Sequence, residues 1–292
     1  MNRVISIDFS HLLHRSVFAN LKMIEETPSF LSHVMLGSII SIMKKFDVKN
    51  DPADVIIATD CSRKNNWRTK FYLEGKEGFP EYSEETYKGN RAKSMKVPWD
   101  EIYTSTGKLL KALEESTDIK VISHENAEAD DVIYTASKEY ERSIIVSSDK
   151  DFHQLISENV KQYDPLKKKF VKIEEDQKRL LQKHILTGQS RKDNIFPCRK
   201  KLGPKTAEKL IEYLDSHLEA DEELRNRYKF NEKLIDLSKV PVEIYDEIKR
   251  EINKDQRNFS TNNLLDFFRE NGLRKITEEI DLFSIKKSNS LF

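Results

Sequence analysis

Cysteine is scarce in this sequence, with only Cys61 and Cys198 among 292 residues. Two isolated cysteines argue against a disulfide framework and against a cysteine-rich zinc site, and they fit a reducing compartment. Long hydrophobic runs are lacking as well, since no stretch approaches the roughly 18 apolar residues that a membrane span needs. The first residues, Met1–Ile5, lead directly into an apolar strand and leave no room for a signal peptide. We therefore expect a cytoplasmic protein without membrane association.

An excess of charge of one sign is also lacking. The 50 basic and 50 acidic residues balance, which at first argues against a nucleic-acid partner. The average conceals two basic segments. Residues 61–98 lose apolar periodicity and hold nine basic against five acidic residues, and a polar connection longer than about 15 residues is usually functional or disordered. Residues 191–209 hold seven basic against two acidic residues.

Short apolar runs alternate with segments of helical spacing in the first part of the chain. Three runs predict buried strands that end in or just before Asp, namely Val4–Asp8, Asp54–Asp60 and Ser143–Ser147. Further strands are expected at Lys120–Ser123, Val160–Tyr163 and Lys169–Ile173, the last two as a hairpin. Helices are expected at His11–Asn20, Phe30–Phe46, Trp99–Leu113, Glu128–Tyr140 and Asp151–Leu155. The alternation predicts an α/β fold with a central, mostly parallel sheet and helices on both faces.

From about residue 174 the apolar spacing becomes helical throughout. Helices are predicted at Glu174–Thr187, Pro204–Leu214, Val240–Ile252, Asn262–Asn271 and Ile276–Ile280. The α/β part is therefore followed by a helical annex.

Acidic residues recur where the strands of the predicted parallel sheet end. Asp8, Asp60 and Asp149 would share one sheet edge, which is where open parallel sheets bind ligands. Glu128-Ala129-Asp130-Asp131 opens a helix, where the partial positive charge of the helix start favours carboxylates. A single acid in such a place is usually a helix cap or a solvated strand end. Eight acids at one edge indicate a divalent metal site: Asp8, Asp60, Glu128, Asp130, Asp131, Asp149, Asp151 and Asp193.

Hard divalent cations such as Mg²⁺ prefer oxygen ligands, and two of them about 4 Å apart serve phosphodiester hydrolysis. An aspartyl-nucleophile phosphatase would need D-x-D at the first strand end. Here that strand ends Asp8-Phe9-Ser10, which argues against this class.

The two basic segments contain candidate phosphate contacts. In Tyr87-Lys88-Gly89-Asn90-Arg91, the cations can neutralise phosphate and Tyr87 can stack on an unpaired base. In the second segment, Gly203 forms a turn and Pro204 takes the first helical position, before Lys205 and Thr206. Exposed N–H groups at such a helix start suit a phosphate. The alternatives are a solvated loop and an ordinary helix start.

The order of these motifs resembles the structure-specific 5′-nuclease superfamily, which includes flap endonucleases and the 5′-nuclease domain of bacterial DNA polymerase I. The chain is most similar to the phage branch, which includes the RNase H enzymes of T-even phages. The resemblance runs over nearly the whole chain and rests on these motifs: Ile7-Asp8-Phe9-Ser10, Trp67-Arg68, Tyr87–Arg91, Glu128–Asp131, Ser147–Phe152, Lys192–Ile195 and Gly272-Leu273.

The resemblance implies roles for individual residues. The first metal ion would be held by Asp8, Asp60, Glu128 and Asp130. The second would be held or supported by Asp131, Asp149, Asp151 and Asp193. Lys88 and Arg91 would contact the scissile phosphate from the base of a helical arch, and with Asp130 and Asp149 they form the expected catalytic set. The expected substrate-binding residues are Arg68, Tyr87, Lys192, Gly203, Lys205 and Thr206.

The implied activity is Mg²⁺-dependent 5′→3′ exonuclease and flap endonuclease action that removes RNA primers during lagging-strand synthesis. Two Mg²⁺ ions are expected, with Mn²⁺ as a substitute and K⁺ at the duplex-binding turn. The implied substrates are flapped or nicked DNA and RNA–DNA hybrid, and the implied protein partners are a sliding clamp and a single-stranded-DNA-binding protein. We expect a monomer, located in the host cytoplasm if a phage encodes it.

The resemblance also implies an organisation along the chain. A nuclease core would span residues 1–187, with the arch inserted at about 61–98. A helical region with a helix–three-turn–helix-like element would bind duplex DNA through residues 188–283. Residues 284–292 would form a tail, in which Ser290-Leu291-Phe292 resembles a clamp-binding peptide. For the similar Ile280-Asp281-Leu282-Phe283 we favour packing of a final helix.

Two positions depart from the family pattern. Ser190 stands where the family has a carboxylate, and a hydroxyl cannot supply the missing charge, so we predict weaker binding of the second metal ion. Lys201 stands where the duplex-binding turn has its first Gly, which puts the potassium site in doubt. Two rival functions stay open: a catalytically weak, structure-specific DNA-binding protein on the same scaffold, and a ribonuclease of the related small acidic-site fold.

Overall fold

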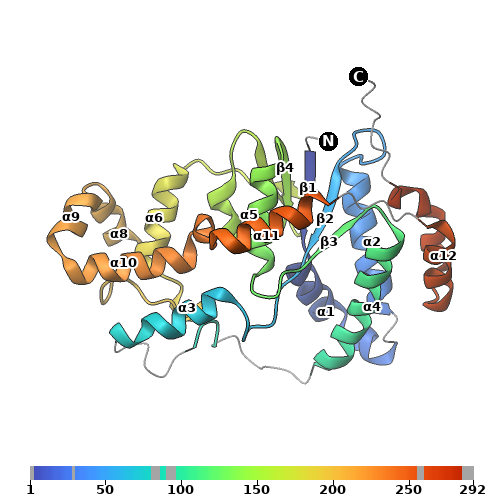
Figure 1. Cartoon of the computed structure of the whole chain (residues 1–292), viewed down its shortest axis with the longest axis horizontal. Helices are drawn as coiled ribbons and strands as arrows, with labels where there is room; N and C mark the ends of the chain where they lie inside the picture. Colours follow the sequence, from blue (N-terminus) through green and yellow to red (C-terminus); the bar gives the residue numbers. More distant parts are fainter. Residues whose placement is uncertain (1–2, 28–29, 80–85, 90–96, 255–259, 285–292) are drawn as a thin grey trace.

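A six-stranded sheet runs through the middle of the molecule (Figure 1). The computed structural model describes residues 3–27, 30–79, 86–89, 97–254 and 260–284. The strand order is β3-β2-β1-β4-β5-β6, with β1 to β5 parallel and β6 antiparallel to β5. The strands are β1 (Arg3–Asp8), β2 (Asp54–Ala58), β3 (Lys120–Ile122), β4 (Arg142–Val146), β5 (Val160–Asp164) and β6 (Lys169–Phe170). The predicted α/β class and parallel sheet are confirmed.

Helices cover both faces of the sheet, and the alternation of side chains along β1 shows why. Ile5 and Ile7 pack into one core and Val4 into another, because successive side chains of a strand point to opposite faces. The first core is completed by α1 (Phe9–Glu26), α2 (Phe30–Lys45), α4 (Trp99–Ser116), α12 (Thr261–Glu270) and the 3₁₀ helix η5 (Arg274–Phe283). The second is completed by α5 (Ala129–Glu139) and α11 (Val242–Asn253). Figure 1 shows α5 and α11 side by side in front of the sheet.

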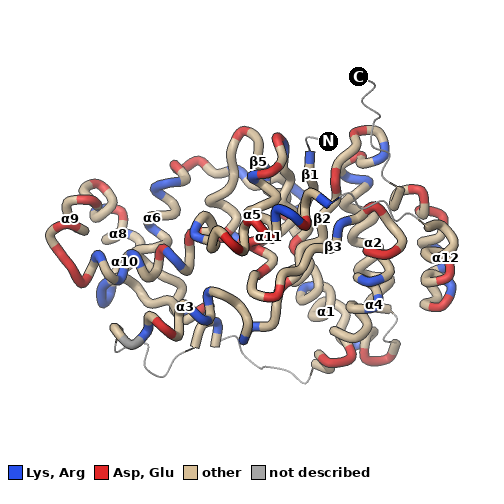
Figure 2. The backbone as a smooth tube through the Cα atoms, viewed as in Figure 1, with Lys and Arg blue, Asp and Glu red and all other residues tan. Residues whose placement is uncertain are grey.

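A third core lies beside the sheet and is built almost entirely from helices (Figure 1). Its helices are α3 (Trp67–Gly75), α6 (Gln177–Thr187), α8 (Pro204–Ile211), α9 (Leu214–Ala220) and α10 (Glu222–Ile235). Short helices link the elements: η1 (Lys76–Gly78), η3 (Lys150–Leu155), α7 (Ser190–Asp193) and η4 (Leu237–Lys239). Lys and Arg positions are interspersed with Asp and Glu positions along the helices on both sides of the sheet (Figure 2).

Three helices differ from the sequence predictions. The structure forms α3 inside residues 61–98, where apolar periodicity was lost, and it forms α9 and α10, which were not predicted. The buried face of α10 contains Arg227 and Asn231, which replace the apolar residues that a core-facing stripe usually shows. The Asn231 amide donates to the Ile185 and Phe196 carbonyl oxygens, both at 2.9 Å. The hydrogen bonds of Asn231 therefore add to the packing of the buried apolar residues of α10, which include Leu224 and Leu234.

The last helices return to the first core. Phe283 is fully buried, packs against Phe268 with the ring centroids 6.1 Å apart, and accepts a hydrogen bond from the Asp118 N–H at its carbonyl oxygen. This agrees with packing of Ile280–Phe283. The suggested clamp-binding tail lies at 285–292, outside the described residues, and the domain boundaries stay predictions. Within the described ranges, no helix is both long and apolar enough to cross a membrane.

Candidate metal and phosphate site

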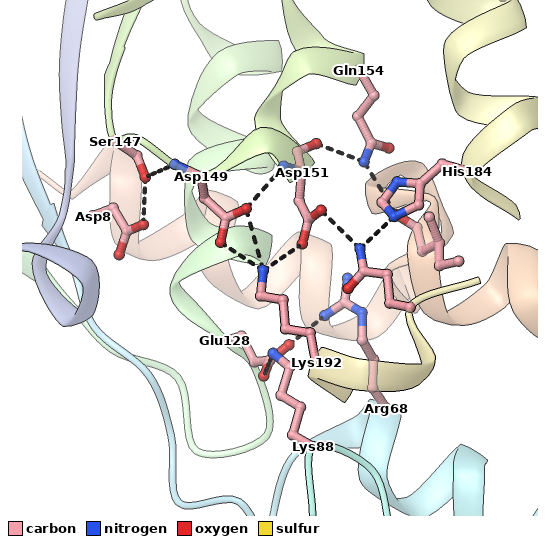
Figure 3. A network of polar contacts seen from close by, with 12 residues as sticks. Asp8, Arg68, Lys88, Glu128, Ser147, Asp149, Asp151, Gln154, His184 and Lys192 are labelled. Carbon is pink, nitrogen blue, oxygen red and sulfur yellow. Dashed lines mark hydrogen bonds and ion pairs between the residues drawn. The ribbon is translucent and has the colours of Figure 1, made fainter. Parts of the chain in front are cut away.

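Two of the predicted acids are linked at the carboxyl end of the sheet. Asp8 ends β1 and caps α1, where its Oδ1 accepts a hydrogen bond from the His11 N–H at 3.0 Å. Its Oδ2 accepts from the Ser147 hydroxyl at 2.8 Å, and that hydroxyl accepts from the Asp149 N–H at 3.0 Å. Gln162 donates to the carbonyl oxygens of Ser147 and Asp149. The loops after β1 and β4 are therefore fixed side by side (Figure 3).

A third strand end meets the start of α5. Asp60 follows β2, and its Oδ1 accepts from the Ala129 N–H at 2.8 Å, at the first residue of α5. A carboxylate at a helix start is favoured by the unpaired N–H groups there. The side chains of Glu128 and Asp130 reach the same cavity as Asp60.

Asp131 belongs to a buried ion pair. Its carboxylate is 2.8 Å from both terminal nitrogens of Arg68 and accepts from Trp67 Nε1 at 3.1 Å and from the Glu128 N–H at 3.0 Å. Asp131 is 0% exposed and Arg68 1% exposed. Neither residue lines the main cavity. In this arrangement both join α3 to α5, and the roles expected from the resemblance, holding or supporting the second metal ion for Asp131 and binding substrate for Arg68, stay predictions.

The basic turn around Lys88 is attached to α7 and the residue after it. The Lys88 N–H donates to the Asp193 carbonyl oxygen at 3.0 Å, and the Asn194 amide donates to the Thr86 carbonyl oxygen at 2.8 Å. Lys88 Nζ lies 2.5 Å from Glu128 Oε1 (Figure 3). The turn therefore presents an ammonium group beside the acids.

Tyr87 is buried, with 3% of its surface exposed, and its hydroxyl lies 3.5 Å from Glu128 Oε2. Stacking on a base would need an exposed ring, so the structure assigns Tyr87 to the core beside Tyr72 instead. Arg91 lies outside the described residues.

Lys192 supplies a second ammonium group. Its Nζ lies 3.0 Å from Asp149 Oδ2 and 3.4 Å from Asp151 Oδ2 (Figure 3). The Asp151 N–H donates to Asp149 Oδ1 at 3.0 Å, and Gln189 donates to Asp151 Oδ1 at 2.9 Å. The two carboxylates are thus held with both oxygens of Asp149 and one oxygen of Asp151 near the same cation.

An open cavity of about 1630 Å³ unites these groups. Its lining includes half of the predicted site residues: Asp8, Asp60, Lys88, Glu128, Asp130, Asp149, Asp151 and Lys192. Asp193 lines a smaller hollow with Tyr87 and Arg68. Among the described side chains, no three metal-binding groups surround one point as they stand. Lysine ammonium groups contact Glu128, Asp149 and Asp151 instead.

The acids next to the lysines differ in how readily they ionise. Burial, reinforced by the charge of Asp60, raises the pKa of Asp8 to about 6. Burial also raises the pKa of Asp130, with Glu128, Asp8 and Asp149 adding repulsion. Burial opposes ionisation of Asp149 too, but Lys192, the Asp151 N–H and His11 together outweigh it and lower the pKa of Asp149. Asp8 and Asp130 therefore lack sufficient positive charge nearby, which is the deficit that a bound cation would supply.

The residues expected to contact duplex DNA lie at the edge of the site. Gly203 precedes α8, whose first residue, Pro204, lines the cavity, while Lys205 and Thr206 are exposed. Lys201 has a φ of 60°, in the left-handed region that favours glycine. This backbone matches the Gly that the family pattern has at this position.

Several residues of the site were not predicted from the sequence. Ser147 follows β4 directly and opens the Ser147–Phe152 motif, and these two features were the signals available for it. Gln189 and His184 lie beside Asp151, in a helix and a loop with no motif of their own. His14, Phe18, Trp99 and Tyr103 form an aromatic cluster on the cavity wall, and only their helical spacing could have suggested it.

Comparison with known proteins identifies the family and supports the fold. The family model for the 5′-3′ exonuclease N-terminal resolvase-like domain matches residues 3–184. Ribonuclease H of Enterobacteria phage T4 is 27% identical over 95% of this chain and 94% of its own length. A 5′-3′ exonuclease of Buchnera aphidicola is 33% identical over 70% of this chain and 68% of its own length.

A solved structure of bacteriophage T5 D15 flap endonuclease, in a complex with DNA and metal ions, superposes with a TM-score of 0.59. The match covers 86% of this chain and 97% of that chain at 16% identity, which supports the fold. The relatives are named as nucleases, and the family model covers more than half of the chain, so the prediction of a nuclease is confirmed. This chain belongs to the 5′-3′ exonuclease family with the resolvase-like N-terminal domain.

Proposed function

We propose that this protein is a Mg²⁺-dependent 5′→3′ exonuclease and flap endonuclease that removes RNA primers and adjacent DNA during phage DNA replication. The observation that supports this most is the cavity in which acids from four separate segments meet Lys88 and Lys192. Similarity to phage T4 ribonuclease H over 95% of the chain supports the RNA-directed activity.

The donor set fits hard divalent cations. Asp149 and Asp151 already direct oxygens at one positively charged nitrogen, and the buried Asp8 and the half-buried Asp130 have raised pKa values. Asp8, Asp60, Glu128 and Asp130 would hold one ion, and Asp149 and Asp151, with Asp193 nearby, would hold the other. Such ions promote the ionisation of a water molecule and neutralise the charge that develops on the phosphodiester. Mg²⁺ is the expected ion, and Mn²⁺ offers the same oxygen preference.

The chain's own residues would bind and orient the substrate. Lys88, held on its turn by the Asp193 and Asn194 contacts, can turn from Glu128 to the scissile phosphate. The start of α8 at Gly203, with Lys205 and Thr206, would contact the duplex backbone, and a K⁺ ion there stays a prediction. Binding of a sliding clamp and of a single-stranded-DNA-binding protein, and the monomeric state, also stay predictions.

Cleavage of two labelled substrates tests the proposal. We expect a 5′-labelled DNA flap and an RNA–DNA hybrid to be cut only when Mg²⁺ is added. The Asp149→Asn variant should lose more than the roughly 10- to 100-fold that removal of an outer partner of a metal site costs, because a ligand itself is lost. Asp215→Asn, on the exposed surface of α9, is the matched control and should cut like wild type.

Other outcomes would favour the rival functions. Tight binding of a junction without cleavage at any Mg²⁺ concentration would contradict the nuclease and favour a DNA-binding protein. The Lys192 contact with Asp149 and Asp151 is the feature that keeps this rival open. Cleavage of single-stranded RNA without any duplex would favour the ribonuclease.

A further inference from the structure

Lys192 occupies the place at which a cation bound by Asp149 and Asp151 would lie. Its Nζ lies 3.0 Å from Asp149 Oδ2 and 3.4 Å from Asp151 Oδ2 (Figure 3). Mg²⁺ and Ca²⁺ bind carboxylate oxygens at about 2.0 to 2.6 Å. A divalent ion within that distance of both oxygens would overlap with the ammonium group and repel its charge, so the two cannot be bound there together.

The carboxylates keep their positions independently of Lys192. Asp149 caps η3 through the Asp151 N–H, and Gln189 donates to Asp151 Oδ1. The loop before them is fixed by Gln162 and Ser147. Exchange of one cation for another at this point therefore requires movement of Lys192 alone.

The Lys192 side chain is free to reorient. Its side chain is 45% exposed, whereas those of Asp149 and Asp151 are 26% and 19% exposed. It lies on α7, a single helical turn, at the wall of the open cavity. An unbranched lysine side chain reorients without backbone change, and the displaced ammonium would remain beside the cavity, where it can contact a phosphate.

We propose that Lys192 is a built-in competitor of the second metal ion. The ion at Asp149 and Asp151 binds only when it displaces the Lys192 ammonium, which lowers the affinity of this site and leaves the other site unaffected. The displaced Lys192 is then available to the substrate, so a phosphate that attracts it strengthens binding of the second ion. This inference rests on the proposed function for the identity of the cations. It goes beyond the weaker second site predicted from Ser190, because it names the Lys192 ammonium as the group that the ion must displace.

Binding of Mn²⁺ to the metal-free full-length chain, without nucleic acid, tests the competition. The number and affinity of bound ions are read from the electron paramagnetic resonance signal of free Mn²⁺. We expect Lys192→Met to bind the second ion about tenfold more tightly than wild type, equivalent to about 1.4 kcal/mol, with the first ion unchanged. Lys192→Arg keeps a competing cation and should retain the weak second site.

Lys150→Met is the matched control. Lys150 lies between Asp149 and Asp151 in sequence and lines the same cavity, but in the described structure it forms no ion pair with either acid. A general loss of positive charge would strengthen Mn²⁺ binding equally in Lys150→Met and Lys192→Met. That result, or unchanged binding in Lys192→Met, would overturn the competition.

The outcome is distinguishable from failure of the proposed function. If the wild type cuts no substrate but Lys192→Met still gains the second ion, the competition holds and the nuclease does not. If the wild type cuts and Lys192→Met binds Mn²⁺ as wild type does, the nuclease is supported and the competition is not. Circular dichroism of each variant shows whether it is folded. If Lys192→Met does not fold, Lys192→Gln, which also lacks the charge, should show the same tighter binding of the second ion.

Discussion

At the scale of single residues, the site contains acids that are held in place before any cation arrives. Asp8 is 6% exposed and is fixed by His11 and Ser147, yet neither contact supplies a full positive charge. Burial raises its pKa from 3.8 to about 6. The fold therefore holds the Asp8 carboxylate at a place where burial makes its ionised form unfavourable.

This opposition predicts a pH-dependent stability. The pKa of Asp8 is higher in the folded than in the unfolded chain, so between about pH 4 and pH 6 the folded state holds the proton more strongly. The stability that the protonated Asp8 contributes is complete below pH 4 and is lost as the pH rises through about 6. Asp8→Asn removes the charge; its amide oxygen can still accept from the His11 N–H, and its NH2 group can donate to the Ser147 hydroxyl oxygen, which reverses that hydrogen bond. We expect the metal-free variant to be more stable than wild type at pH 7 by about 1 to 3 kcal/mol, since each pKa unit corresponds to about 1.4 kcal/mol.

Urea unfolding in the presence of a chelator measures this effect. The difference between Asp8→Asn and wild type should be large at pH 7 and should vanish near pH 4, where Asp8 is protonated. An equal difference at both pH values would mean that packing, and not ionisation, separates the two proteins. The variant should also be inactive as a nuclease, because it lacks an expected metal ligand.

At the scale of elements, the start of α5 is held by α3. Arg68 and Trp67 both contact the Asp131 carboxylate, so one buried acid joins a helix inside residues 61–98 to the sheet-covering helix. Removal of one partner from a buried ion pair leaves an uncompensated charge.

Arg68→Met is therefore expected to lower the free energy of unfolding by about 3 to 5 kcal/mol. Asp131→Asn introduced together with Arg68→Met removes the unpaired charge and keeps an acceptor oxygen for Trp67 Nε1 and the Glu128 N–H, so it should recover part of the loss. Lys70→Met, on the exposed side of α3, is the control and should cost little. Urea unfolding of the four proteins measures these effects. A small loss in Arg68→Met, with weakened DNA binding, would instead support the substrate-binding role first expected for Arg68.

At the scale of the whole molecule, the C-terminal helices belong to the same core as the first strand. Phe268 of α12 and Phe283 of η5 are fully buried in the core that includes Ile5 and Ile7. Residues more than 250 positions apart therefore unfold together if the core is one cooperative unit.

Phe268→Ala tests this cooperation. Loss of a buried phenylalanine side chain costs about 3 to 5 kcal/mol, because a cavity remains. We expect a single unfolding transition that moves to lower urea concentration equally by far-ultraviolet circular dichroism and by tryptophan fluorescence. Trp67 reports from the second core and Trp99 from α4. Two separate transitions would show that α12 and η5 unfold on their own. Phe267→Ala, at the partly buried neighbouring position, should have a smaller effect.

Local pattern determined much of this protein. Apolar runs that end in Asp predict the parallel strands, because a strand buried on both faces must be continuously apolar. Parallel strands have their carboxyl ends at one edge, so the meeting of Asp8, Asp60 and Asp149 also follows from the sequence. The order of the motifs also indicated the 5′-nuclease family, which the comparisons confirm.

Only the tertiary structure decided which charges pair. Asp130 and Asp131 are neighbours in the sequence, but helix geometry turns Asp130 to the cavity and Asp131 to Arg68, 63 positions away. Lys192 contacts Asp149 and Asp151 across about 40 residues, and α10 is held by a polar Asn231. Such pairs depend on the distance and direction of side chains from separate segments, for which the periodicity of a single segment carries no information.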